Sequence, residues 1–266
     1  MKKQKNRYSQ IIEKIFLMNY EEGTERIAFR REDILRAARE LRISLPKNVG
    51  DVIYSFRYRA SLPDSIRRMA PPGKEWIIEP AGRSVYGFVA ASFSIVSPAE
   101  NLVETKLPDA TLGIIALYAL TDEQAILAKL RYNRLIDIFT GVTSYSLQSH
   151  LRTSVEEMGQ IETDEIYVGI DKRGMHYVFP VQAKGHTDSI HVVQIQQDIA
   201  MCREKFPDLI CRPIAAQFIT AELIALFEFE EQSNEIRVSS EKHYRLVDPA
   251  EFSSEDLELY RQRTLD

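Results

Sequence analysis

The segment from Gln160 to Gly185 constrains the fold more than any other part of the chain, because it contains two strand-like runs joined by a short turn. The runs EIYVGI and HYVFPV are rich in β-branched and aromatic residues, which favour strands. The intervening DKRG ends in Gly174, which can adopt the positive φ that tight hairpin loops need. The segment therefore predicts a β-hairpin.

The length of the hairpin loop decides which residues face one another. If Lys172 pairs with Met175, Glu165 faces Gln182; if residues 172–174 form a three-residue bulged loop, Asp164 faces Gln182 instead. We favour the bulged loop, because it sets the alternate apolar residues of the first run on one continuous face. Both registers bring an acid close to the end of the second run.

The end of the second run carries residue types that suit a divalent metal beside a phosphate. Side chains alternate along a strand, so Gln182 and Lys184 share a face and Ala183 lies between them. Mg²⁺ prefers oxygen ligands, which Asp164 and the amide of Gln182 supply, and Ala183 completes the expected metal site. Lys184 can stabilise charge on a phosphate or orient the attacking water. This arrangement is typical of phosphodiester hydrolysis.

An acid, a hairpin, the sequence Gln182-Ala183-Lys184 and a following helix together resemble the PD-(D/E)XK superfamily of restriction and repair endonucleases. The resemblance is to the variant with glutamine in place of the second acid, as in Mrr-type enzymes, and covers roughly residues 120 to 220 through short motifs. It implies a restriction-endonuclease-like α/β/α domain with a mixed sheet and a Mg²⁺ cofactor, with Mn²⁺ as a substitute. It also implies that Asp164 binds the metal, Gln182 is the second ligand and Lys184 is the catalytic lysine. Gln182 is neutral, so Asp164 has to supply more of the negative charge that binds the metal.

Several acids compete for the metal-binding role. Glu162 and Glu165 flank Asp164, and Glu165 is included in the expected catalytic set. Residues 122–139 predict a long helix that begins after Thr121. In the resembled family this helix often offers a glutamate to the metal; Glu123 is the early candidate here, although capping is the commoner role for an acid in a first turn.

For two histidines and two glutamines near the expected site, a role outside the chemistry is the commoner interpretation. His150 and His186 are each able to contact phosphate, but solvated or hydrogen-bonded histidines are commoner. A helix predicted over residues 190–206 carries Gln194 and Gln197, which are able to face the site but are more often exposed.

The net charge of −5 hides an asymmetry between the two ends of the chain. Residues 1–75 carry a balance of +7 and the remaining residues a balance of −12. A basic surface attracts the DNA backbone through counterion release, independently of base sequence. We therefore expect the N-terminal part to bind double-stranded DNA.

The N-terminal part has the element order of a winged helix. Apolar periodicity predicts helices over residues 8–20, 31–41 and 49–58, and the runs EWIIEP and SVYGFVA form a hairpin around residues 81–83. The third helix would enter the major groove and the hairpin turn would form a wing. The expected DNA-binding residues are Lys47, Tyr54, Ser55, Arg57, Arg59 and Arg83. Packing in the domain core is the competing interpretation for Tyr54 and Tyr58.

These patterns predict a winged-helix-like domain over residues 1–95, a linker over 96–120 and a nuclease-like domain over 121–266. No apolar stretch reaches the length of a membrane helix and the N-terminus lacks the apolar part of a secretory signal, so we expect a cytoplasmic protein. Two cysteines without CxxC spacing do not indicate a zinc site or a disulfide framework.

The expected function is a Mg²⁺-dependent double-stranded DNA endonuclease of the type II restriction kind, acting as a homodimer. The alternative is a winged-helix transcriptional regulator whose C-terminal domain is catalytically silent and serves dimerisation or effector binding. A third interpretation is a structural partner that keeps the nuclease fold without cleavage.

Overall fold

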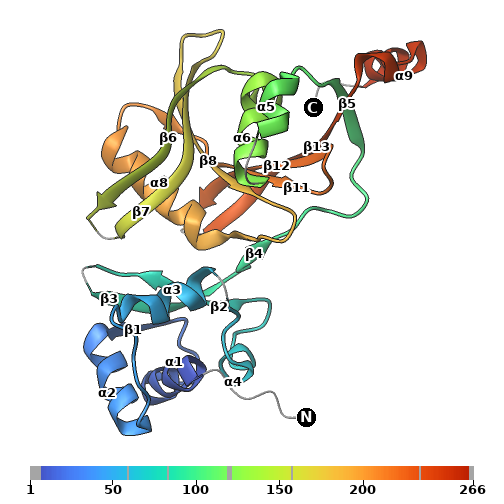
Figure 1. Cartoon of the computed structure of the whole chain (residues 1–266). Helices are drawn as coiled ribbons and strands as arrows, with labels where there is room; N and C mark the ends of the chain where they lie inside the picture. Colours follow the sequence, from blue (N-terminus) through green and yellow to red (C-terminus); the bar gives the residue numbers. More distant parts are fainter. Residues whose placement is uncertain are drawn as a thin grey trace, which may run out of the picture.

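The computed structural model describes residues 7–58, 60–82, 84–118, 122–156, 158–233 and 235–263 (Figure 1). The chain forms a mixed α/β protein with an N-terminal domain and a larger C-terminal domain, each around its own apolar core. Among the described residues, no helix has the length and apolar character needed to cross a membrane.

The N-terminal domain places helices against a small antiparallel sheet with the order β1–β3–β2. Its elements are α1 (Arg7–Asn19), β1 (Arg26–Arg30), α2 (Arg31–Leu41), α3 (Gly50–Tyr58), α4 (Asp64–Arg67), β2 (Glu75–Pro80) and β3 (Val85–Ala91). The three predicted helices and the predicted hairpin are confirmed. β1 and α4 were not predicted; β1 buries Ile27 and Phe29 on one face and pairs with β3, a non-local partner.

The start of α3 follows from local hydrogen bonding. Asn48 precedes the helix, and its side-chain oxygen accepts a hydrogen bond from the Gly50 N–H at 3.1 Å, as expected of a capping residue. α3 then buries Val52, Ile53 and Phe56 in the domain core and turns the rest of its surface outward. The opposite surface of α3 faces the C-terminal domain (Figure 1).

The C-terminal domain is built on a mixed sheet with the order β5–β13–β12–β11–β8–β7–β6, and β10 also pairs with β8. Its strands are β4 (Ile95–Val96), β5 (Glu104–Pro108), β6 (Thr143–Val155), β7 (Gly159–Ile170), β8 (His176–Lys184), β9 (Ile190–His191), β10 (Ile210–Cys211), β11 (Ile214–Phe218), β12 (Leu223–Gln232) and β13 (Glu235–Val247). Its helices are α5 (Gly113–Tyr118), α6 (Asp122–Tyr132), α7 (Leu135–Thr140), α8 (Val192–Lys205), a 3₁₀ turn (Pro249–Glu251) and α9 (Ser254–Gln262).

Helices cover both faces of this sheet. Residues of α6 and α7 share a buried cluster with Tyr167 and Phe179, whereas residues of α8 share another with Ile166 and Val178. Because neighbouring residues of a strand point to opposite faces, both faces of the β7–β8 hairpin are buried, and this explains its nearly continuous apolar sequence.

The β7–β8 hairpin has the three-residue bulged loop. Ile170 pairs with His176 and Glu165 with Val181, and the Asp171 N–H donates to the carbonyl of Met175 at 3.1 Å. Gly174 closes the loop with a φ of 82°. The favoured register is therefore confirmed, and its continuation sets Asp164 opposite the end of β8.

Two segments differ from the sequence expectations. The helix predicted over residues 122–139 is broken by Arg134, whose φ is 53°, and becomes α6 and α7. Residues 96–120, expected to be a linker, contain β5, which lies parallel to β13 at the edge of the large sheet. The apolar run around Pro213 forms β10 and β11, and β11 is paired on both sides because the proline lies in the break between them.

Candidate active site

Asp164 is fixed at the point where the β7–β8 ladder ends. Its Oδ2 atom accepts a hydrogen bond of 2.7 Å from the Ala183 N–H, and the Nζ atom of Lys184 lies 3.7 Å from the same oxygen. The carboxylate therefore takes the place of a backbone acceptor just beyond the Glu165–Val181 pair. One acid and one lysine are held together in mostly buried positions, as the sequence predicted.

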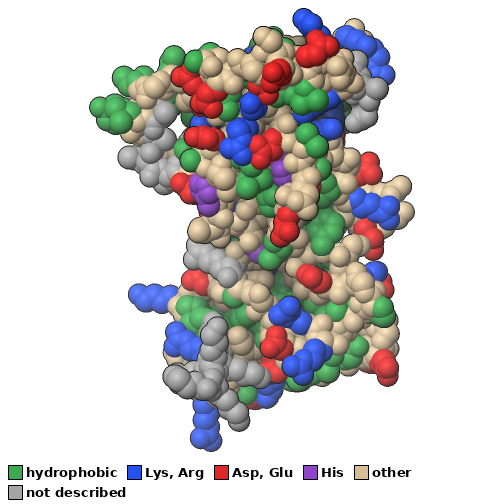
Figure 2. All heavy atoms as spheres, turned by 90° about the vertical axis from the view of Figure 1, so that its right-hand side faces the viewer, with side chains coloured by type: hydrophobic (Ala, Val, Ile, Leu, Met, Phe, Trp, Pro, Cys, Tyr) green, Lys and Arg blue, Asp and Glu red, His purple; other side chains and the backbone are tan. Residues whose placement is uncertain are grey.

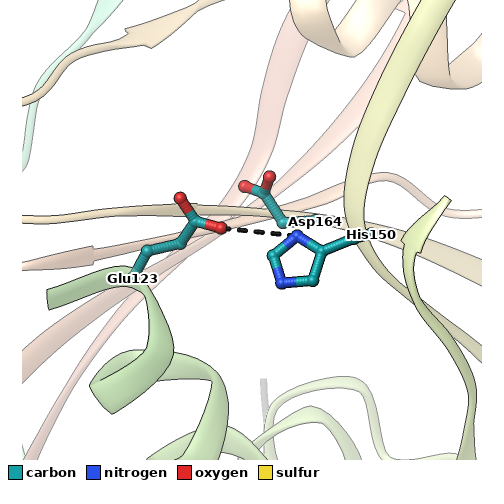
Figure 3. A group of neighbouring side chains, drawn as sticks. All are labelled: Glu123, His150 and Asp164. Atoms are coloured by element: carbon teal, nitrogen blue, oxygen red, sulfur yellow. Dashed lines mark ion pairs between the residues drawn. The ribbon is translucent and has the colours of Figure 1, made fainter. Parts of the chain in front are cut away.

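Glu123 and His150 join Asp164 to form a cluster of three ligand-bearing side chains (Figure 3). One ligand atom from each residue lies within 4.8 Å of the other two, and the Nδ1 atom of His150 is 3.7 Å from Oε1 of Glu123. The residues come from the first turn of α6, from β6 and from β7. They are the groups of the described residues best placed to hold a metal ion.

The pairing of β6 with β7 brings His150 into this cluster. Ser149 pairs with Glu165 and Leu151 with Thr163, so His150, whose φ is 49°, lies opposite Asp164 on the neighbouring strand. β6 was not among the strands expected from the sequence, and the acid of Glu123 was indistinguishable from a helix-capping acid.

The electrostatics of the cluster favour a cation. Partial burial raises the pKa of Glu123, and the nearby negative charge of Asp164 raises it further, while Lys184 and His150 act in the opposite direction. Two carboxylates at short distance repel one another unless a proton or a cation lies between them.

Gln182 is held by hydrogen bonds from α8. Its Nε2 atom donates to Oδ2 of Asp198 at 2.9 Å, and its Oε1 atom accepts from Nε2 of Gln194 at 3.1 Å. Asp198 also accepts a hydrogen bond of 2.6 Å from the hydroxyl of Thr163. Burial raises the pKa of Asp198 to about 7, although the hydrogen bonds from Thr163 and Gln182 lower it. Gln182 is thus near Asp164, but its amide oxygen is already engaged.

Glu165 lies apart from the cluster. Its fully buried side chain points to the opposite face of the sheet, where it accepts a 2.6 Å hydrogen bond from Nε of Arg131 on α6 and another from the hydroxyl of Ser146. The expectation that Glu165 belongs to the catalytic set does not fit this placement, because strand alternation separates it from Asp164. Glu162, the other neighbour, pairs with Arg152 at 2.9 Å.

The site opens into a cleft of about 650 Å³ between the two domains. One wall contains Asp164, Gln182 and Lys184, and the other contains Tyr54 and Arg57 of α3. Lys47 is exposed ahead of α3 and Ser55 is half-buried, and neither lines the cleft. Arg59 and Arg83 lie outside the described residues, as does Thr121.

The face of the molecule drawn in Figure 2 shows no simple charge pattern. On the face in Figure 2, Lys and Arg side chains are interspersed with Asp and Glu over both domains, and the molecule narrows where the domains meet. The basic excess of residues 1–75 therefore does not gather into a single patch on this face.

The chain was compared with protein-family models, curated proteins and solved structures, and none of the three comparisons found a match. Its function therefore has to be inferred from the geometry and chemistry of the cleft.

Proposed function

We propose that the protein is a metal-dependent deoxyribonuclease that hydrolyses phosphodiester bonds, of the restriction-endonuclease kind. The observation that carries this proposal is the cluster of Glu123, His150 and Asp164 beside Lys184 in one cleft. Acids that bind a cation and a lysine that binds a phosphate are the two parts that this hydrolysis needs.

The order of elements around the cleft supports the proposal. α6 and α7, the antiparallel strands β6, β7 and β8, then α8 and the parallel strand β11 follow the order expected from the resemblance to PD-(D/E)XK nucleases. In the N-terminal domain, the order α1, β1, α2, α3, α4, β2, β3 is that of a winged helix apart from the short helix α4. We therefore propose a winged-helix-like domain that binds DNA and a nuclease-like domain that cuts it.

The donor set of the cluster fits a divalent metal. The carboxylates of Glu123 and Asp164 suit Mg²⁺ or Mn²⁺, and the imidazole of His150 favours a transition metal, so Mn²⁺ suits the mixed oxygen and nitrogen set better than Mg²⁺. When bound, such an ion lowers the pKa of a coordinated water and offsets negative charge on the phosphate. In place of Gln182 and Ala183, we therefore assign Glu123 and His150 as the partners of Asp164.

The remaining residues of the site position the carboxylate of Asp164 and neutralise charge on the phosphate. The Ala183 N–H holds one oxygen of Asp164, which leaves the other oxygen of the carboxylate for the ion. The ammonium of Lys184, held near Asp164, is placed to donate a hydrogen bond to a phosphate oxygen. Gln194 and Asp198 fix the amide of Gln182, so Gln182 has a structural role in the wall of the cleft.

Incubation of the full chain with methylated and unmethylated plasmid DNA tests the proposal. We expect cleavage with Mn²⁺ and Mg²⁺, none with EDTA, and none for the Asp164→Asn variant. Glu162→Gln is the matched control, because Glu162 is a neighbouring acid that pairs with Arg152 outside the cluster. DNA binding that is equal with and without EDTA, together with no cleavage under any metal, would favour the transcriptional regulator instead.

A further inference from the structure

Arg57 carries buried N–H groups that the described part of the chain leaves without an acceptor. Its Nε and Nη2 atoms are buried and have no hydrogen-bond partner among the described residues. The guanidinium lies over the ring of Tyr58, 4.9 Å from its centroid, and burial lowers the pKa of Arg57. A guanidinium remains charged, and buried donors without acceptors cost free energy. An anionic ligand would therefore stabilise Arg57 in this position.

The position of Arg57 indicates where that anion would bind. Arg57 lines the cleft opposite Asp164 and Lys184. The other cations of that cleft already have acidic partners: Lys184 lies beside Asp164 and Arg152 pairs with Glu162. Arg57 differs from both, because its buried N–H groups are available to a ligand.

A second cavity of about 900 Å³ adjoins the first. Arg57, Tyr58 and His191 line both cavities, so the space between the domains runs past Arg57 on two sides. Trp76 lines the second cavity. A chain-like ligand with a repeating negative charge fits two adjoining cavities that share Arg57, whose buried N–H groups have no acceptor among the described residues.

The cleft is closed to a duplex at this point. The hydroxyl of Tyr58 on α3 donates a 2.8 Å hydrogen bond to Oε1 of Gln197 on α8, so the two domains touch across the cleft. A duplex seated on α3 would have to occupy the space that this contact closes, whereas each cavity has the volume of a site for small ligands. Tyr54, which is 48% exposed, offers a ring on which a single base can stack.

We propose that the cleft binds a single DNA strand, separated from its complement, and that Arg57 holds a backbone phosphate of that strand opposite Lys184. The proposal rests on the nuclease function proposed above. It gives Arg57 a role at the site of cleavage, in contrast to the role in reading a duplex groove that its place on α3 suggests.

Trp76 is the single tryptophan of the chain and lines the second cavity, which adjoins the cleft at Arg57, so its fluorescence reports on a strand that runs through both. We would titrate the full chain in EDTA with oligothymidine of about 12 nucleotides, and with the same strand paired to its complement. The expected result is saturable quenching by the single strand and none by the duplex. Equal quenching by both would overturn the proposal, because the cleft would then admit a duplex.

Substitution of Arg57 tests its part. We expect Arg57→Ala to weaken binding of the labelled single strand by about tenfold or more, since a charge-assisted hydrogen bond is lost. Arg36→Ala removes the same charge from α2, where Arg36 pairs with Asp33 outside both cavities, and should leave the affinity unchanged. Equal affinities for the two variants would contradict the assignment.

Thermal unfolding separates binding from folding. Arg57→Ala removes an unpaired buried charge and should not lower the Tm, whereas a marked fall would show that Arg57 is structural and would overturn the proposal. Cleavage of duplex DNA by Arg57→Ala at the wild-type rate would also overturn it while leaving the nuclease function intact. Strand binding that depends on Arg57, without cleavage under any metal, would support the site and contradict the nuclease function.

Discussion

Asp164 and Glu165 are adjacent on β7, but they lie on opposite faces of the sheet in contrasting electrostatic surroundings. Glu165 is fully buried, bonded to Arg131 and Ser146, and its bond with Arg131 raises the pKa of that guanidinium. Asp164 lines the cleft, beside a second acid and a lysine held at ion-pair distance. A carboxylate with a bonded counter-ion stabilises the fold, whereas one placed beside another acid is available to a cation.

Two lysines show the same contrast between a residue of the cleft and a residue that stabilises the fold. Lys184 lies near Asp164 in the cleft, and Lys129 on α6 pairs with Asp109 at 3.0 Å. Their side chains are similarly buried, 15% and 16% exposed, so they differ in surroundings and not in accessibility. Paired variants at these two positions distinguish a contribution to chemistry from a contribution to folding.

The largest effect is expected from Lys184→Ala. Loss of one electrostatic group that stabilises the transition state costs about 100-fold or more in rate, while folding and DNA binding should persist. Lys129→Ala should lower the Tm and leave the cleavage rate unchanged. The measurement is single-turnover cleavage of plasmid DNA with Mn²⁺. Retention of more than roughly a tenth of the rate by Lys184→Ala would contradict its assigned role.

Substitution of the two adjacent acids should separate activity from stability. Asp164→Asn should remove metal-dependent cleavage and the rise in Tm on adding Mn²⁺. Glu165→Gln should retain more of the activity but lower the free energy of unfolding by about 2 kcal/mol, below the full cost of breaking a buried pair because the Arg131 side chain is 40% exposed. Urea unfolding and cleavage assays measure both quantities. The reverse ranking of activities would place the metal on the Glu165 face.

His150 should set the choice of metal. The imidazole favours a transition metal, so His150→Ala should reduce cleavage with Mn²⁺ more than cleavage with Mg²⁺. His186, which lies 3.3 Å from Asp122, offers a matched histidine outside the cluster, and His186→Ala should leave the ratio of the two rates unchanged. An unchanged ratio in His150→Ala would remove His150 from the proposed ligands.

The smallest effect concerns pH and Asp198. Its pKa is raised from 3.8 to about 7 by burial, so the folded state favours the protonated form more than the unfolded state does. The stability that this group contributes is therefore complete below about pH 4 and is lost as pH rises through 7. Asp198→Asn should unfold at higher urea than wild type at pH 8, with little difference at pH 4. If the variant were more stable than wild type only at low pH, the assigned direction of the pKa shift of Asp198 would be wrong.

Much of the local structure could be predicted because short-range interactions determine it. Gly174 and the turn before it fix the β7–β8 register, and the periodic apolar residues of α1 and α2 fix those helices. The proximity of Asp164 to Lys184 followed from that register alone. In these cases the residues that decide the structure are near one another in the chain.

Only the tertiary structure decided the rest, because the residues concerned depend on distant partners. β5 is a strand because β13 pairs with it, and Glu165 leaves the site because Arg131 holds it on the other face. His150 reaches Asp164 because β6 pairs with β7, and Arg57 faces the cleft because α3 contacts α8 through Tyr58. A sequence pattern records which side of a strand or helix is apolar, but it does not record which distant element will lie against the polar side.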